Sequence, residues 1–130
     1  MIKFSLLITT LFIFNSSYSQ VQTEKEIKDL LCHKWKPDSI ETSGQRIPVP
    51  PGIEETFLDL KTDGALISGD LVTLQKGKWH YDHKRTTLTI EKESDDVLKY
   101  ELIKITENEL TLKFTIQEEM SITIVMKRVD

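Results

Sequence analysis

The residues best suited to chemistry are two histidines and an aspartate, His80, Asp82 and His83, within four consecutive positions. Imidazole and carboxylate side chains at such short spacing could hold a metal ion. A zinc ion, however, needs three or four ligands in a tetrahedron, usually with hydrogen-bonded partners behind them. The further candidate ligands, Cys32 and His33, lie far away in the sequence. We therefore expect neither a metal site nor another cofactor in this stretch.

The same stretch is better explained as a β-hairpin. Threonine and aliphatic residues alternate in segment 86–91, which is typical of a strand with one buried face. A turn must then lie at 82–85, and aspartate favours such a position because its side chain can bond the backbone two residues on. On the preceding strand, His80 points away from the face that carries Trp79 and Tyr81. If Trp79 faces inward, His80 faces solvent.

A catalytic constellation is missing from the sequence. Serine hydrolases place their nucleophile on a strained turn, and no G-x-S-x-G motif occurs. Cys32 and His33 are adjacent, so on a strand their side chains point to opposite faces and cannot form a dyad. Carboxylate pairs at 54–55 and 95–96 fall at strand ends and turns, where charge is solvated. We therefore expect a protein that is not an enzyme.

The first residues have the pattern of an export signal. Lys3 provides a positive start, an uncharged apolar run follows at 4–14, and Ser17 and Ser19 give the small-x-small pattern that signal peptidase accepts. A bilayer span needs about 20 apolar residues, so the run is too short to be a membrane anchor. The sequence predicts cleavage after Ser19 and a protein that is periplasmic or secreted, with no membrane span in the mature chain.

Residues 1–19 are thus interpreted as a signal peptide and residues 20–130 as one domain. The formal net charge of the chain is −4, with both signs interspersed and no basic stripe, which argues against a nucleic-acid partner. The single cysteine, Cys32, cannot form an internal disulfide. It lies too far behind the apolar run for lipid attachment. We expect a small buried residue there rather than a reactive thiol, and a monomeric protein.

A short helix opens the domain. Thr23 and Glu26 have the spacing of a capping box, and Ile27, Leu30 and Leu31 form one apolar face at i, i+3 and i+4. A helix of about two turns is not stable alone, so this face must pack on the rest of the domain.

After the helix the hydrophobic period changes to two, and eight strands are expected. They span 34–42, 53–60, 65–68, 71–81, 86–91, 97–105, 110–116 and 120–128. Short connections favour antiparallel neighbours. A meander of eight strands leaves two edge strands with unpaired backbone groups unless the sheet closes on itself. The sequence therefore predicts an all-β, eight-stranded antiparallel up-and-down barrel, with the helix closing one end. A two-sheet sandwich is the alternative.

Three local features are expected within this meander. Pro37 should produce an edge or a bulge in the first strand, and imperfect alternation in 97–105 also allows a bulge. Gly64 can take a positive φ in the turn 61–64. The proline-rich segment 43–52 is expected to be an extended loop, either a stiff connection or a rigid lip over a barrel mouth.

The chain resembles small exported bacterial lipocalin-like proteins over residues 30–128. Four segments, which occur in the same order as in that family, carry the resemblance: LLCHKWKPDSI, FLDLKTDGAL, GKWHYDHKRTTLTI and YELIKITENELTLKF. The resemblance implies a calycin-type barrel of eight strands with an N-terminal helix, often without a known ligand. Trp35 matches the tryptophan of the Gly-x-Trp signature, whereas His33 stands at the glycine position. The resemblance further implies that Arg128 stacks on Trp35 after the last strand, a cation–π contact that would stabilise the fold by roughly 0.5–2 kcal/mol.

Inward aromatic residues either fill a small barrel or line a cavity for one ligand. The residues expected to line such a cavity are Trp35, Phe57, Trp79, Tyr100 and Phe114. Lys76 and Lys78 would lie outside, so no polar group for a ligand headgroup is evident inside. The leading hypothesis is an exported, non-enzymatic protein that binds a small apolar molecule. The alternative is a protein-interaction module, an inhibitor or envelope factor with a filled barrel, that uses the loop 46–52 or an open barrel end.

Overall fold

A computed structural model describes residues 22–42, 44–70, 72–94, 96–117 and 120–130. The expected signal peptide and its cleavage site lie outside these residues. Within them, no helix is long and apolar enough to cross a membrane.

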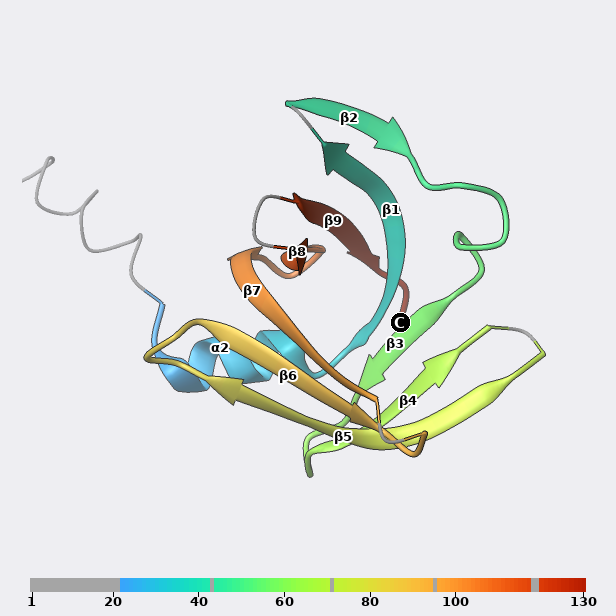
Figure 1. Ribbon diagram of the computed structural model, residues 1–130. Coiled ribbons are helices and arrows are strands. Elements are labelled where there is room, and N and C mark those ends of the chain that lie inside the picture. Colours follow the sequence, from blue (N-terminus) through green and yellow to red (C-terminus); the bar gives the residue numbers. More distant parts are fainter. Residues whose placement is uncertain (1–21, 43, 71, 95, 118–119) are drawn as a thin grey trace, which may run out of the picture.

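The described residues form nine antiparallel strands in one sheet (Figure 1). The strands are β1 (Lys34–Thr42), β2 (Gln45–Pro48), β3 (Phe57–Leu60), β4 (Ala65–Gly69), β5 (Leu74–Asp82), β6 (Thr87–Lys92), β7 (Val97–Ile105), β8 (Glu109–Gln117) and β9 (Met120–Arg128). Neighbours follow the order β2-β1-β3-β4-β5-β6-β7-β8-β9, and β1 also pairs with β9. This last pairing closes β1 and β3–β9 into a barrel of eight strands, so the predicted barrel is confirmed and the sandwich is not adopted.

The ninth strand, β2, corrects one expectation from the sequence. The segment 43–52 was expected to be a loop, but Gln45–Pro48 pairs with the end of β1, with Ile47 opposite Ile40. Only the edge of β2 that faces β1 is paired, and proline is tolerated in such an edge strand. The expected strand 53–60 is also shorter than predicted: residues 51–55 form turns, and β3 begins at Phe57.

The turns and bulges follow the sequence more closely. Gly64 has a φ of +88°, and the carboxylate of Asp82 accepts hydrogen bonds from the backbone N–H groups of Lys84 and Arg85, at 3.1 and 3.4 Å. The register of β1 against β9 shifts just after Pro37, and that of β7 against β8 shifts after Leu102. The predicted hairpin turn and both predicted bulges are therefore confirmed.

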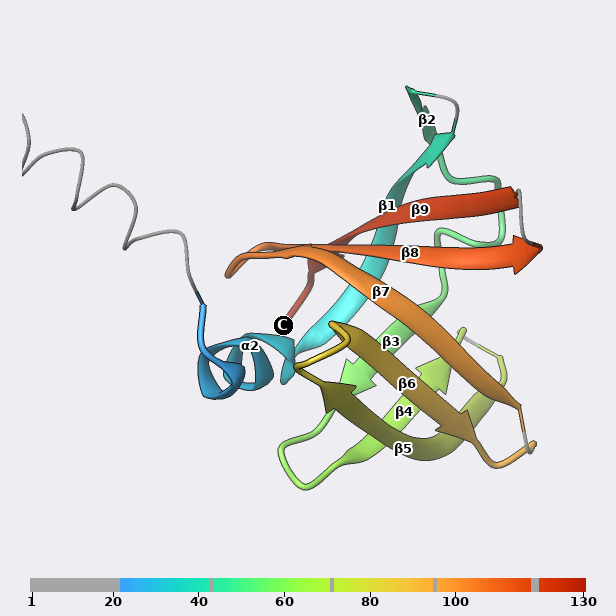
Figure 2. The same ribbon diagram turned by 60° about the vertical axis from the view of Figure 1, so that its left-hand side comes forward.

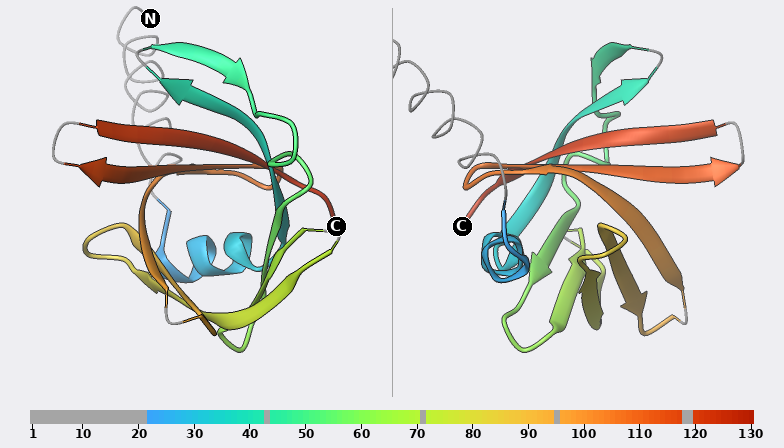
Figure 3. Two further views of the ribbon diagram at one scale, coloured as in Figure 1. Left: turned by 45° about the vertical axis from the view of Figure 1, so that its right-hand side comes forward. Right: turned by 90° about the vertical axis from the view of Figure 1, so that its left-hand side faces the viewer.

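Helix α2 (Glu24–Leu31) covers one end of the barrel, as predicted (Figures 2 and 3). The Thr23 hydroxyl oxygen accepts a 3.2 Å bond from the backbone N–H of Glu26, which caps the first turn. Ile27 and Leu31 are buried in the barrel core, and Leu30 packs against it. Packing therefore stabilises a helix too short to form alone.

The half of the barrel next to α2 is filled with side chains. Five residues of one hydrophobic cluster are each no more than 1% exposed: Trp35, Leu60, Tyr81, Leu88 and Leu110. Burying such side chains contributes about 1.5–3 kcal/mol each, before the entropy cost of ordering them. This packed base determines where open space remains in the interior.

Candidate functional site in the outer half of the barrel

A cavity of about 290 Å³ lies in the half of the barrel that points away from α2. Its lining residues are Pro37, Ile53, Thr56, Phe57, Leu58, Ser68, Gly69, Lys92, Tyr100, Leu112, Ile124 and Met126. Seven strands contribute to this lining: β1, β3, β4, β6, β7, β8 and β9. The cavity is therefore the barrel lumen and not a surface groove. Its volume is at the lower end of the range of about 300–1,000 Å³ typical of ligand pockets.

Most of the cavity wall is apolar. Leu112 and Ile124 are cross-strand partners on β8 and β9, and Met126 follows one pleat further toward the base. Tyr100, on β7, packs its ring against Phe114 with 5.4 Å between centroids. Burial raises the pKa of the Tyr100 hydroxyl above its usual value, so this group is neutral at physiological pH.

The connection between β2 and β3 forms a lip over the cavity. Ile53 and Thr56 both line the lumen. Thr56 is fixed to Ile53 twice, because its backbone N–H and its hydroxyl both donate to the Ile53 carbonyl, at 3.0 and 2.7 Å. The turn begins with the N–H of Ile53 donating to the carbonyl of Pro50. The residues that cover the cavity therefore follow the proline-rich segment 43–52, which contributes the Pro50 carbonyl to this turn.

Besides Thr56 and Tyr100, two polar side chains line this largely apolar space. Ser68, on β4, is 6% exposed, and its hydroxyl oxygen has no hydrogen-bond partner among the described residues. Lys92, the last residue of β6, is the one charged residue in the cavity lining. No ion pair to Lys92 occurs within the described ranges of the chain.

The space near Lys92 depends on a glycine. Gly77 of β5 lies opposite both Leu66 and Lys92, so these three residues form one row across β4, β5 and β6. A Cβ at position 77 would collide with the backbone carbonyl of Glu91. Glycine therefore permits the close approach of β5 and β6, and it leaves the inner face without a side chain between Leu66 and Lys92.

The five residues predicted to line a cavity are divided by the structure. Tyr100 lines the lumen, and Phe114 supports it from the side. Phe57 reaches the cavity only at the start of β3, where Leu58 and Leu60 face inward and the Phe57 ring contacts Lys34 on the other face. Trp35 is 0% exposed and belongs to the packed base, where its indole N–H donates to the Leu31 carbonyl at 3.0 Å. Trp79 also packs against the core, but it lies near the helix end, and its indole N–H donates to the Lys61 carbonyl.

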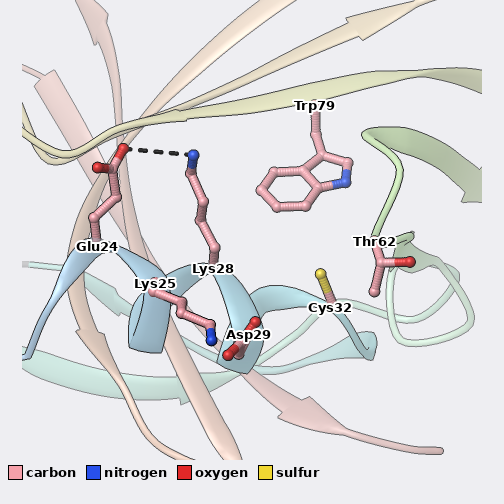
Figure 4. A pocket seen from close by; sticks show the side chains of 7 residues that line it. All are labelled: Glu24, Lys25, Lys28, Asp29, Cys32, Thr62 and Trp79. Atoms are coloured by element: carbon pink, nitrogen blue, oxygen red, sulfur yellow. Dashed lines mark ion pairs between the residues drawn. The ribbon is translucent and has the colours of Figure 1, made fainter.

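A second hollow, of about 360 Å³, lies between α2 and Trp79 (Figure 4). One side is formed by Glu24, Lys25, Lys28 and Asp29, and Glu24 pairs with Lys28 at 3.4 Å. The sulfur of Cys32 points into this hollow below the Trp79 ring. Charges of both signs along one wall make it less suited than the lumen to an apolar ligand.

Cys32 is only partly buried, which corrects the expectation of a buried residue. Burial raises the pKa of its thiol, and the negative charge of Asp29 raises it further. The thiol is therefore protonated at neutral pH and is a poor nucleophile.

The histidine-rich hairpin has the orientation expected from its sequence. His80 is exposed, whereas Tyr81 is 1% exposed and faces the core. The ring nitrogen Nδ1 of His83 lies 3.3 Å from the Tyr81 hydroxyl. Within the described part of the chain, no group of three or more His, Cys, Asp or Glu residues could hold a metal ion.

Arg128 lies opposite Trp35 in the register of β1 and β9 but does not stack on it. Its guanidinium instead bonds the Asp130 carboxylate at 3.0 Å and the Glu107 carbonyl at 3.5 Å. The structure shows a cation–π contact elsewhere, with Lys34 Nζ 4.4 Å from the centre of the Phe57 ring. The expected stacking is therefore wrong, because nearby oxygens offer the guanidinium charge-assisted hydrogen bonds.

The closed barrel, its capping helix and the half-open lumen define a lipocalin-like fold of the calycin type. A solved structure with this arrangement is that of a lipocalin-like protein from Bacteroides uniformis. The two chains superimpose with a TM-score of 0.58 at 12% sequence identity, over 77% of this chain and 99% of that one. No protein-family model matches the sequence, and no curated protein matches it. The fold implied by the resemblance is therefore confirmed.

Sequence reasoning missed Ser68 and Lys92 as lumen residues. Lys92 was assigned to a polar turn, but the pairing of Gly77 with Lys92 extends β6 by one residue and places this side chain on the inner face. Ser68 ends an alternating segment in which Leu66 is buried, and this two-residue period was the available signal that its side chain also faces inward.

Proposed function

We propose that this protein is an exported, non-enzymatic binding protein that holds one small, largely apolar molecule in its lumen. The observation that carries the proposal is the half-open cavity of about 290 Å³, which is lined mainly by apolar side chains and lies above a packed base. Binding would be driven by burial of apolar ligand surface, at roughly 25 cal/mol per Å².

The surroundings of the cavity support entry from the end opposite α2. The described large apolar residues that are exposed at this end are Ile47, Ile53, Val72, Leu74, Val97 and Met120. They belong to β2, to the connections that face away from α2, or to the adjoining ends of strands. An apolar rim of this kind lowers the cost of transferring an apolar molecule from water into the lumen.

Nuclear magnetic resonance provides a direct test with 1-octanol as the probe. The expected result is a saturable, one-to-one set of chemical-shift changes confined to lumen residues such as Tyr100, Leu112 and Ile124. The variant Ile124→Trp should fill the cavity and abolish these changes. Ile103→Trp adds the same side chain at an exposed position of β7 outside this rim and should leave them intact. Scattered or absent changes in the folded wild-type protein would refute lumen binding.

A protein partner is the second candidate function, and the exposed apolar rim is the observation that favours it. Size-exclusion chromatography of the protein mixed with extracts of its own cells shows whether a partner binds. The same experiment with the variant Val72→Asp separates the two functions. A partner lost on this substitution, together with no binding of 1-octanol, would support the interaction module. Binding of 1-octanol that survives the substitution would support the carrier.

Export is part of the proposal and has its own test. Intact-mass measurement of the protein recovered from the periplasm or the culture medium should correspond to a chain that begins at Gln20. A full-length chain retained in the cytoplasm would contradict the signal-peptide interpretation of residues 1–19.

A further inference from the structure

We propose that the lumen selects a short amphiphile with a carboxylate head, which Lys92 and Ser68 bind together. This inference rests on the proposed function and specifies the chemical class of its ligand. It follows from two polar groups of the lumen wall that have no partner among the described residues.

The first observation is the hydroxyl group of Ser68. The side chain is 6% exposed and lines the cavity, yet its oxygen has no hydrogen-bond partner among the described residues. Buried hydroxyl groups are nearly always paired, because an unpaired group loses its bonds to water without compensation. A ligand oxygen in the lumen would supply the missing partner.

The second observation is the single cation of the lining. Lys92 is half-buried, faces the lumen and has no ion pair within the described residues. No acidic residue lines the cavity, so the local field favours a negative ligand group. One ammonium group and one hydroxyl donor match the charge and the acceptors of a carboxylate. A phosphate dianion would bring a second negative charge, and no further cation lines the cavity to balance it.

The positions of the two groups also determine the direction of the ligand. Lys92 ends β6 at the side of the barrel away from α2, and Ser68 lies near the corresponding end of β4. Gly77 leaves the inner face next to Lys92 open. Leu112, Ile124 and Met126 line the apolar part of the cavity. The carboxylate head therefore lies toward the mouth, and the hydrocarbon tail points toward the packed base.

The volume limits the length of the tail. A water molecule has a share of about 30 Å³ in the liquid, and a methylene group is of similar size, so the cavity holds on the order of ten non-hydrogen atoms. Octanoate has this size. A long-chain fatty acid would extend beyond the mouth.

Isothermal titration calorimetry at pH 7 tests the proposal with three probes of equal chain length: octanoate, 1-octanol and octylammonium. Octanoate should bind the wild-type protein about tenfold or more tightly than 1-octanol, because hydrogen bonds to a charged group are the stronger ones. Octylammonium, which places a positive charge beside Lys92, should bind more weakly than both.

Variants assign the effect to the two residues. Lys92→Met retains an apolar stem and should reduce the affinity for octanoate to about that of 1-octanol in the same variant, whereas Lys92→Arg should retain the preference. Ser68→Ala should weaken octanoate binding severalfold. Lys76→Met, on the exposed face of β5, is the matched control and should change nothing. Melting curves of all variants establish that they are folded.

The outcomes separate this inference from the proposed function. If 1-octanol binds but octanoate is not preferred, or if Lys92→Met retains the preference, the head site is refuted and lumen binding stands. If neither probe binds the folded wild-type protein, both proposals fail.

Discussion

The indole N–H of Trp35 donates a 3.0 Å hydrogen bond to the carbonyl of Leu31, the last residue of α2. The same carbonyl accepts a 2.7 Å bond from the backbone N–H of His33. The first residues of β1 are therefore attached to the end of the helix, and the Trp35 ring fills the space between helix and barrel. This arrangement seals the base and restricts open space to the other half of the lumen.

Replacing Trp35 with Phe should lower the free energy of unfolding by roughly 2–4 kcal/mol, since it removes buried apolar area and leaves a cavity. The loss of the hydrogen bond adds little, because His33 still satisfies the Leu31 carbonyl. Trp79→Phe is the matched comparison. It also loses a bond to a carbonyl, that of Lys61, but from a partly exposed ring. Urea denaturation should show a clearly smaller effect at Trp79, and equal effects would contradict the packed base.

Two buried serines should respond in opposite directions to replacement by alanine. Ser68→Ala should raise the free energy of unfolding of the ligand-free protein by about 1 kcal/mol, because it removes an unpaired hydroxyl group. Ser39→Ala should lower it by about 1 kcal/mol, because the Ser39 oxygen accepts a 2.9 Å bond from Arg46. Both serines are 6% exposed, so the two changes are matched in burial.

Thermal and urea unfolding of the two serine variants measure this difference. Destabilisation of similar size at both positions would show that the Ser68 hydroxyl group is satisfied in the folded protein. That result would also remove one of the two observations behind the proposed head site.

The side chain of Arg46 should hold β2 against the barrel. Besides its bond to Ser39, it lies 3.8 Å from a carboxylate oxygen of Glu41 and 4.0 Å from one of Glu109. Arg46→Ala should therefore increase hydrogen exchange of the β2 amides several-fold. Global stability should change by less than about 1 kcal/mol, because these ion pairs are largely exposed. Gln45→Ala, at the neighbouring strand position, should have little effect, and unchanged exchange in Arg46→Ala would exclude this role.

The carboxylate of Asp130 should make stability depend on pH in the acid range. Burial alone would raise its pKa, but bonds from the Lys34 N–H and from Arg128, together with His33, lower it overall. A lowered pKa means that the stabilisation is present above the unfolded value of about 3.9 and is lost as pH falls through the folded value.

The difference in unfolding free energy between wild type and Asp130→Asn should therefore be largest above about pH 5 and shrink below about pH 4. Its size should stay under about 1 kcal/mol, since the carboxyl group is largely exposed and screened by solvent. Chemical denaturation between pH 2 and pH 6 measures it. A difference that stays constant over this range would contradict the expectation.

Much of the fold was accessible from local patterns. The period of two identified each of the eight barrel strands, although the second and the fourth began later than expected, at Phe57 and Leu74. The aspartate at position 82 and the glycine at 64 marked their turns correctly. The strand β2 was missed because a segment rich in proline pairs poorly on both edges, whereas here only one edge is used.

Alternation along a strand by itself determined which side chains face inward, because successive residues of a strand point to opposite faces of the sheet. Only the tertiary structure decided what those side chains do. Trp35 and Tyr100 both face the interior, yet the level of each along the barrel axis places one in the packed base and the other at the cavity. That level depends on strand pairing and on the end that α2 covers, which are relations between residues far apart in the chain.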